Sequence, residues 1–310
     1  MGKERWRRRL LEKASYVLKL DERCAWNLIG TGKTMIWLGR LAATMGLQPG
    51  YLGNYPSINY ILGTELSEPS GVRIGESDLG ERPILKKVEW EIPGVPFLRV
   101  WSHRHTPDLV CEISNTLSEP LASTVMWLSL DVVYERAIRC GGIPLHAALA
   151  EHSGRAFLLA GDHGAGKTTC CSRLPMTWSA LCDDETFVLN GNYEYYAHPF
   201  PRWSDYLFQA PQQPIDVSKR APLSAIFFLE KAARVEIVSI GIGEAVVRIN
   251  ESANQACRTR MRGFETLVRR QLRTKILDNA CKLAGQVPAY VLRVSKTGRF
   301  WKAIEEVVAF

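Results

Sequence analysis

The sequence lacks the long hydrophobic runs that would cross a membrane. Its longest strongly apolar stretches, such as VMWLSL at 125–130, are far shorter than the roughly 20 residues that a transmembrane helix needs. The opening residues, MGKERWRRR, contain no apolar segment of the kind found in a secretory signal, and Trp6 stands where a myristoylation motif has Ser or Thr. We therefore expect a cytoplasmic protein without a membrane partner.

The sequence also has no C-x-x-C pair, although it contains eight cysteines. They are scattered along the chain without a nearby histidine that would complete a zinc set. Internal repeats and low-complexity tracts are absent as well. We therefore expect reduced cysteines that pack as small hydrophobic side chains, including the neighbouring Cys170 and Cys171.

The composition is that of an ordinary globular protein, with 46% hydrophobic and 23% charged residues in a chain of 310. This length suggests one large domain or two modest ones. Short strand-like runs such as SYVLKL at 15–20 and turn-rich stretches fill the first 120 residues. A helix is expected over 120–142, ending at a pair of glycines. The boundary between the two parts therefore falls near 120–140.

A phosphate-binding loop pattern follows the apolar run AFLLA. Residues 161–170 read GDHGAGKTTC, which fits the spacing G-x-x-x-x-G-K-[ST]. The glycines allow backbone conformations in which successive N–H groups point at phosphate oxygens. Lys167 would reach the terminal phosphates, and the hydroxyl of Thr168 would bind magnesium. We therefore predict a site for ATP and Mg²⁺ formed by Gly161, Asp162, His163, Gly164, Ala165, Gly166, Lys167, Thr168 and Thr169.

The segments on both sides of the loop suit this prediction. RAFLLA at 155–160 is typical of a short buried strand, and KTTCCSRL at 167–174 of a short helix that Pro175 ends. Strand, loop and helix thus come in the order that a phosphate site needs. The alternative for the pattern alone is a solvent-exposed glycine turn. Later strands are expected at 187–190, 225–230, 235–240 and 289–294.

Two adjacent carboxylates follow the loop closely. The segment SALCDDET places Asp183 sixteen positions after Lys167, so a short helix and an immediate return would bring Asp183 and Asp184 beside the phosphates. One carboxylate could bind magnesium, directly or through water, while the other accepts the proton of an attacking hydroxyl. The alternative is a polar strand end or turn, a setting that aspartate pairs also favour.

The net charge of +7 is concentrated in two segments. Residues 1–13 contain six Lys or Arg and two Glu, and residues 258–282 contain eight Lys or Arg and two acids. The second segment is predicted to be an amphipathic helix, because its apolar residues recur at helical spacing: Phe264, Leu267, Val268, Leu272, Ile276 and Leu277. Its basic face either is simply solvated or binds an acidic peptide or a phosphate-bearing partner. Nucleic acid is not expected, since no nucleic-acid motif accompanies the charge.

The stretches LHAALAEHSGRAFLLAGDHGAGKTT, LCDDETFVL and AHPFP together resemble the catalytic domain of HPr kinase/phosphorylase and related P-loop kinases. These relatives include kinases of cassettes that mature ribosomally made peptides, such as lasso-peptide kinases and a SynChlorMet cassette protein. The resemblance covers about 140–200 and implies an α/β fold of the HPr kinase and phosphoenolpyruvate carboxykinase type. It would make 121–310 the catalytic domain and 1–120 an N-terminal α+β extension that takes part in substrate recognition.

The resemblance also implies roles for individual residues. Lys167 and Thr168 would bind the ATP phosphates and magnesium. Asp183 corresponds to the acid/base aspartate of the family and Asp184 to its neighbour near the metal, so the implied metal ligands are Thr168 and Asp184. His146 corresponds to a catalytic-centre histidine on the strand before the loop. Read without the family, His146 is equally well explained as a hydrogen-bonded core histidine.

The sequence departs from the HPr kinase pattern at several points. His163 stands where those kinases usually have Ser, and it either contacts phosphate or simply fills the loop. The glycine-rich arginine signature after the aspartates is absent, which argues against HPr as substrate and against the reverse phosphorylase reaction. Arg202, Lys219 and Arg220 are candidates to neutralise the charge on the transferring phosphoryl group. His198 could face the same cleft or cap a turn.

The sequence thus predicts a kinase that uses ATP and Mg²⁺ to phosphorylate a hydroxyl, preferably serine, of a peptide or protein. Homo-oligomerisation stays open. A small-molecule hydroxyl kinase is the first alternative and would have a closed, arginine-lined pocket beside Asp183. A nucleotide-dependent peptide-binding scaffold without catalysis is the second, and the presence of Lys167, Thr168 and Asp183 together argues against it.

Overall fold

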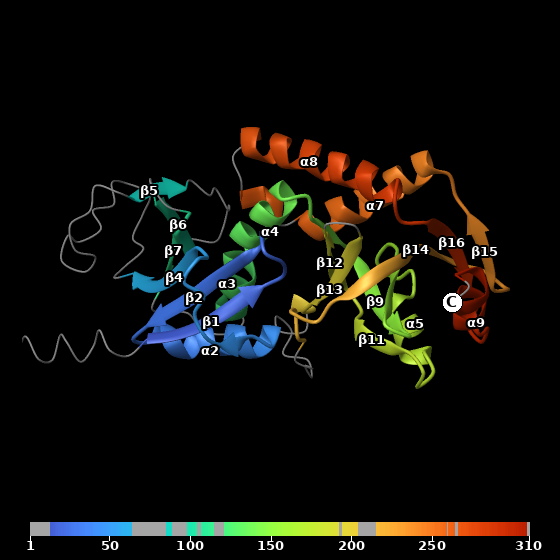
Figure 1. The fold of residues 1–310 in the computed structure, drawn as a ribbon, viewed down its shortest axis with the longest axis horizontal. Helices are drawn as coiled ribbons and strands as arrows, with labels where there is room; N and C mark the ends of the chain where they lie inside the picture. The colour runs from blue at the N-terminus through green and yellow to red at the C-terminus, as the bar shows by residue number, and fades with distance from the viewer. Residues whose placement is uncertain are drawn as a thin grey trace, which may run out of the picture.

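The structure, a computed structural model, describes residues 13–63, 85–88, 98–103, 107–114, 121–191, 194–203, 215–258, 260–263 and 266–308. Its described strands form two mixed β-sheets that are accompanied by helices, so the chain has the α/β architecture that its sequence predicts. The sheets lie side by side (Figure 1), the first built from the N-terminal strands and the second from the later ones.

The first sheet combines a parallel centre with antiparallel flanks. Helix α2 (Thr34–Met45) follows the parallel strand β2 and contributes Leu38 and Leu41 to the core beneath the sheet. The described strands run in the spatial order β3 (Gln48–Pro49), β1 (Lys13–Lys19), β2 (Ala25–Thr31), β4 (Ser57–Gly63), β7 (Leu109–Ser114), β6 (Leu98–His103) and β5 (Leu85–Val88).

The second sheet carries the predicted phosphate loop at the end of strand β10. Its described strands run in the order β11 (Ser179–Cys182), β9 (Ala147–His152), β10 (Arg155–Ala160), β14 (Ala221–Lys231), β13 (Tyr195–Phe200), β12 (Glu185–Asn190) and β8 (Ile143–Leu145), with β16 (Ala289–Val294) beside β14 and β15 (Glu236–Ser239) beside β16. Strands β10, β14 and β16 are parallel. Their carboxyl ends therefore meet at one edge, the edge where open α/β sheets bind ligands.

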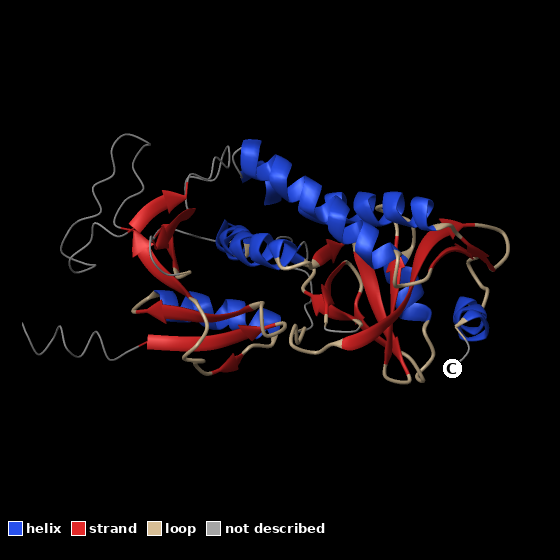
Figure 2. Ribbon diagram, turned by 45° about the horizontal axis from the view of Figure 1, so that its top comes forward, coloured by secondary structure: helices blue, strands red, loops and turns tan. Residues whose placement is uncertain are grey.

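Helices cover both faces of the second sheet (Figure 2). Its one face packs against α7 (Ile242–Cys257) and α8 (Thr266–Ala284), and its other face against α5 (Lys167–Arg173) and α9 (Phe300–Val307). In β10, Leu158 joins the core on the α7 and α8 side and Leu159 the core on the opposite side. This alternation is typical of a strand that is buried on both faces. The remaining described helices are α3 (Leu121–Ser129), α4 (Asp131–Arg139) and the 3-10 helix η1 (Arg260–Gly263).

Most of the predicted strands and the loop helix are confirmed. The runs at 155–160 and 289–294 are β10 and β16, and the short helix after the loop is α5. The other predicted strands correspond to parts of β1, β12, β14 and β15. The runs in β10, β12, β14 and β16 are largely apolar and buried, whereas β15 is mostly exposed and its β-branched residues favour a strand.

The single helix predicted over 120–142 is wrong, because the chain forms α3 and α4 with a break at Leu130. Leu130 donates its N–H to the carbonyl of Trp127 at 3.3 Å, a tight turn that starts the second helix in a new direction. The break places Asp131 in the first turn of α4, where it is fully buried against Arg260. The predicted glycine end is confirmed, since Gly141 follows the helix with a φ of 94°.

Helix α8 confirms the helix predicted within 258–282 only from Thr266 onward, because Arg260–Gly263 form η1. Its predicted buried face is also confirmed only in part. Leu272 and Ile276 are buried, whereas Leu267 and Leu277 are 65% and 44% exposed. Asn279 is buried in place of an apolar residue, and its side-chain amide donates to the carbonyls of Ile138 and Gly142 at 2.9 and 2.8 Å. Helical spacing alone did not reveal this polar contact with the end of α4.

Several predicted features lie outside the described residues: the basic segment within 1–12 and Phe264. Arg260, counted above as part of the second basic segment, is 2% exposed and paired with Asp131, so it adds nothing to the basic surface. None of the helices in the described part of the chain is long and apolar enough to span a membrane. The division at residue 120 stays a prediction, although most buried apolar residues of α3 and α4 belong to the same core as the first sheet, with Ile138 in the core of the second.

Candidate functional site

The phosphate-loop residues form the predicted turn between β10 and α5. Gly166 caps α5 with a φ of 108°, a left-handed conformation that L-residues with a side chain rarely adopt. A Cβ on Gly161 would lie 2.9 Å from the Cβ of Ala165, which sits on the facing side of the turn. The glycines at 161 and 166 are thus required by the geometry of the turn itself.

Lys167 is the buried member of this loop, with 7% of its surface exposed. Its ammonium donates to the carbonyls of Gly161 and Asp162 at 2.8 and 3.3 Å and to Nε2 of His146 at 2.8 Å. These three acceptors match the three donors of an ammonium group. Burial lowers the pKa of Lys167, while the nearby carboxylate of Asp184 acts in the opposite direction.

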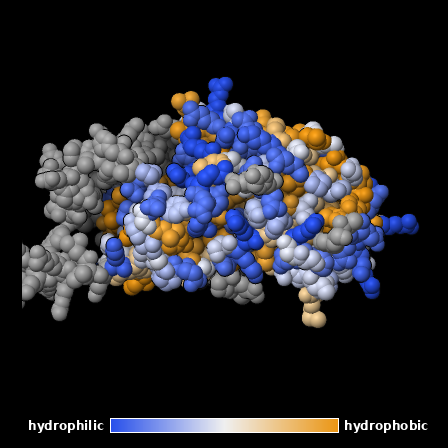
Figure 3. Space-filling view, viewed as in Figure 1, coloured by the Kyte–Doolittle hydropathy of each residue, from blue (hydrophilic) through white to orange (hydrophobic). Residues whose placement is uncertain are grey.

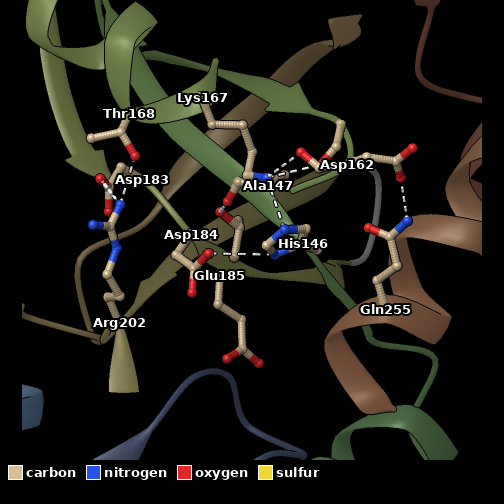
Figure 4. Close-up of polar contacts among 12 residues, drawn as sticks. His146, Ala147, Asp162, Lys167, Thr168, Asp183, Asp184, Glu185, Arg202 and Gln255 are labelled. Atoms are coloured by element: carbon tan, nitrogen blue, oxygen red, sulfur yellow. Dashed lines mark hydrogen bonds and ion pairs between the residues drawn. The ribbon is translucent and has the colours of Figure 1, made fainter. Parts of the chain in front are cut away.

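His146 connects Lys167 to Asp184. Because its Nε2 accepts from the Lys167 ammonium, its proton is on Nδ1, and Nδ1 lies 3.4 Å from Oδ1 of Asp184. Burial and the neighbouring positive charge of Lys167 both lower the pKa of His146, which favours this neutral form. The histidine lies at the bend between β8 and β9, not on the strand immediately before the loop. Figure 4 shows Lys167, His146 and Asp184 in one chain of contacts.

Asp183 points away from this chain, toward Thr168. The guanidinium Nη2 of Arg202 donates to Thr168 Oγ1 at 2.7 Å and forms an ion pair with Oδ2 of Asp183 (Figure 4). The hydroxyl and the carboxylate thus converge on a single cationic nitrogen. Hydroxyl and carboxylate oxygens are ligands that Mg²⁺ accepts, so the two oxygens that contact Arg202 here could also bind a divalent cation.

A polar groove lies on the other side of the loop. It has a volume of about 840 Å³ and is lined by Asp162, by Gln255 and Arg258 at the end of α7, and by Arg273 and Leu277 of α8. Gln255 donates to the carboxylate of Asp162 at 2.5 Å, which ties α7 to the loop. Helix α8 runs along the top of the molecule in Figure 3, where the surface is largely hydrophilic.

A buried ionic cluster beneath the aspartates was not anticipated from the sequence. Arg260 donates to Oδ1 of Asp131 at 2.8 Å and lies 3.8 Å over the ring of Tyr134, whose hydroxyl contacts Glu185. Burial raises the pKa of Asp131 to about 7 and also raises that of Glu185. Glu185 begins β12 directly after Asp184, so the cluster fixes the strand that follows the turn in which both aspartates lie. The sequence signal for this cluster was Glu185, the third acidic residue of the run DDE.

The other candidate residues are placed less centrally. His198 is fully buried in β13 and donates through Nδ1 to the carbonyl of Val217 at 3.0 Å, and burial lowers its pKa to about 4, so it is a core histidine. Arg220 stacks over the ring of Tyr196 at 4.4 Å. Lys219 and His163 are exposed. Of the three candidate cations, Arg202 is the one that contacts Thr168 and Asp183.

The family model of the SynChlorMet cassette protein ScmC matches residues 109–309. The chain belongs to the SynChlorMet cassette protein ScmC family. The ScmC match includes every residue of the site from His146 to Leu277, whereas it begins at β7 and so leaves out the earlier strands of the first sheet. The segment shared with the ScmC family is therefore the one that carries the candidate site. No curated protein matches the chain.

Proposed function

We propose that this ScmC family member is an ATP- and Mg²⁺-dependent kinase of the HPr kinase type that phosphorylates a hydroxyl, preferably serine, of a peptide or protein. The observation that carries the proposal is the convergence of two contact chains on one phosphate loop. Lys167 is linked through His146 to Asp184, and Thr168 is linked through Arg202 to Asp183. A loop that only shaped a turn would have no reason to collect a lysine, a histidine and two carboxylates.

The loop residues Gly161 to Thr169 would hold the phosphates. Backbone N–H groups at the start of α5 point toward an anion, and the partial positive charge of the helix end adds to the attraction. Lys167 would exchange its long contact with the Asp162 carbonyl, at 3.3 Å, for a phosphate oxygen. This exchange leaves its two shorter hydrogen bonds in place, which would keep the ammonium oriented.

The contacts favour a division of labour that is the reverse of the one implied by the family resemblance. Thr168 and Asp183 share one cationic partner, so we assign the magnesium to them, where it would neutralise charge on the phosphates. Asp184 faces His146, so we assign it to the acceptor hydroxyl. The resemblance-based assignment, Asp183 as base and Asp184 with Thr168 as metal ligands, stays a prediction to be tested against this one.

In the proposed reaction the acceptor oxygen attacks the γ-phosphorus in line with the leaving ADP oxygen. A new P–O bond to the acceptor forms as the bond between the γ-phosphorus and the bridging oxygen breaks, and the hydroxyl proton passes to the carboxylate of Asp184. His146, with its proton on Nδ1, would orient that carboxylate. Because phosphoryl transfer has a loose transition state, positioning and charge neutralisation are expected to contribute more than proton removal.

A peptide or protein acceptor is supported by the groove beside Asp162. The groove lies between α7 and α8, and its lining carries the guanidinium groups of Arg258 and Arg273 beside the carboxylates of Asp162 and Glu251. The two arginines would each contact an acidic side chain of an acceptor segment. A small-molecule kinase would need an enclosed, arginine-lined pocket beside Asp183, and Asp183 does not line this groove.

Transfer of label from γ-³²P-ATP to a library of acidic peptides, each with one serine, tests the proposal. We expect acid-stable label on serine in the presence of Mg²⁺, and none on matched peptides in which alanine replaces the serine. The Asp184→Asn variant should bind ATP but label the same peptides far more slowly. Tight ATP binding without transfer to any peptide or to water would favour the non-catalytic scaffold instead.

A further inference from the structure

A second pocket lies against the phosphate loop on the side opposite the groove. It has a volume of about 490 Å³ and is bounded by Gly166 and Thr169 at the start of α5, by Lys231 and Ala232 at the end of β14, and by Val294 and Lys296 at the end of β16. We propose that this pocket binds the nucleoside part of a nucleoside triphosphate. The inference rests on the proposed function, because it assumes that the loop holds the phosphates.

The position of the pocket in the sheet supports this assignment. Strands β10, β14 and β16 are parallel, and the loop, Ala232 and Ser295 each follow the carboxyl end of one of them. Ligands of open α/β sheets bind at this edge. The pocket is thus built from three successive strand ends and the helix that follows the first.

The direction of the loop supports it as well. The groups assigned to the transferring phosphate, namely Lys167, His146, Asp183 and Asp184, do not line this pocket. Gly166 and Thr169 do: they stand on either side of Lys167 and Thr168 in the chain, and Thr169 lies further along the first turn of α5. A triphosphate that runs along the loop with its last phosphate at Lys167 therefore points its nucleoside toward Thr169 and into the pocket.

The lining has the chemistry that a nucleoside needs. Ala165, Cys170, Ala232 and Val294 supply apolar contacts for a flat base, and the ammonium groups of Lys231 and Lys296 lie at the rim for the α-phosphate or the sugar hydroxyls. The volume is within the range of small-ligand pockets. No lining residue is aromatic, so the base would be held by apolar packing between strand ends and not by stacking.

The far wall of the pocket is fixed before any ligand binds. Arg173 of α5 donates through Nη1 to the carbonyl of Ser295 at 2.8 Å and through Nη2 to the carbonyl of Gly298, and its guanidinium lies 5.4 Å over the ring of Phe300. Gly298 also donates its N–H to Ser295 Oγ at 2.9 Å. These contacts hold the segment 295–298 against α5, so little ordering of this wall is needed on binding.

The test compares two neighbouring alanines. Ala232 lines the pocket, whereas Ala233 is exposed and does not. Calorimetric titrations of the full chain with Mg-ATP and with Mg-tripolyphosphate, which lacks a nucleoside, should show that Ala232→Trp weakens ATP binding by about tenfold or more and leaves tripolyphosphate binding unchanged. Ala233→Trp should bind both ligands as the wild type does.

Photolabelling of the wild-type chain with 8-azido-ATP gives a second readout that needs no substitution. Label on the peptides that contain 231–234 or 295–299 supports the proposal. This result does not depend on the Ala232→Trp variant, which could misfold and then bind neither ATP nor tripolyphosphate. Two results would overturn the nucleoside site alone. One is label confined to α7 or α8, and the other is an Ala232→Trp variant that binds both ATP and tripolyphosphate with unchanged affinity. A wild-type chain that binds neither ligand would instead overturn the proposed function.

Discussion

Lys167 links the phosphate loop to His146 through its ammonium group. The ammonium contacts the carbonyls of Gly161 and Asp162 at the start of the loop as well as His146, so neighbouring groups and not solvent hold it in place. Burial lowers the pKa of Lys167. The sequence predicted the loop, Lys167 and Thr168 from spacing alone. It did not predict which aspartate faces which partner, because both lie in the turn between β11 and β12, where no spacing rule fixes the direction of a side chain.

The first prediction separates the roles of the two aspartates. Asp184→Asn should lower kcat by roughly two to four orders of magnitude, the usual contribution of a general base, and added magnesium should not restore it. Asp183→Asn should instead raise the magnesium concentration needed for half-maximal rate. Single-turnover transfer across a magnesium titration measures both. The opposite pattern would return the base to Asp183 and the metal to Asp184.

The second prediction concerns Arg202, whose guanidinium contacts Thr168 and Asp183. If these two oxygens hold the metal, the arginine must leave before the metal binds, so Arg202→Gln should tighten Mn²⁺ binding by about tenfold, equivalent to about 1.4 kcal/mol. Electron paramagnetic resonance of free Mn²⁺ measures this in the presence of ATP. Arg220→Gln, an arginine stacked on Tyr196 elsewhere, is the matched control. Weaker Mn²⁺ binding in Arg202→Gln would rule out competition.

Helices α4, α7 and α8 determine how the site is held, and here the sequence was less informative. Short apolar runs identified β10 and β16 because a strand buried on both faces is apolar throughout. The break at Leu130 and the exposed Leu277 were missed, since both depend on tertiary partners. The break lets Asp131 meet Arg260, and Leu277 lines the groove and so stays exposed.

The third prediction uses the pair formed by α4 and η1. Burial raises the pKa of Asp131 to about 7. Between about pH 4 and that value, its carboxyl group is therefore protonated in the folded chain and ionised in the unfolded chain. The stability from this group is fully present below about pH 4, the ordinary aspartate pKa, and is lost as pH rises toward the raised value. Between about pH 5 and 7 the wild type should lose up to about 1.4 kcal/mol of unfolding free energy per pH unit relative to Asp131→Asn. Urea unfolding at several pH values measures the difference, and parallel curves would contradict it.

The fourth prediction concerns the groove face of α8. Arg273 lines the groove, so Arg273→Glu should raise KM for an acidic peptide severalfold and leave ATP hydrolysis without peptide unchanged. Lys282 is an exposed cation on the same helix that does not line the groove, and Lys282→Glu is the matched control. The difference should shrink at high salt, because exposed charges are screened. Equal effects of both substitutions would show that only the overall charge of the helix matters.

For the molecule as a whole, the phosphate loop lies at the edge where the ends of β10, β14 and β16 meet, between a groove on the α7 and α8 side and a pocket beside α5. This arrangement would bring the acceptor and the nucleoside to the loop from opposite sides. The sequence predicted the α/β class and the loop at its centre, but the two flanking cavities could not be read from it. They are formed by residues far apart in the chain, such as Asp162 with Arg273 and Thr169 with Lys296.

Calorimetric titration with Mg-ATP of the wild type and of Lys167→Ala tests the central claim, that the loop is a nucleotide phosphate site. Lys219→Ala, which removes an exposed lysine, is the matched control, and a melting curve checks that each variant is folded. We expect the wild type and Lys219→Ala to bind alike and Lys167→Ala to bind about 100-fold more weakly, since a charged hydrogen bond to phosphate contributes about 1.5–3 kcal/mol. Equal ATP affinity in a folded Lys167→Ala variant would contradict the account.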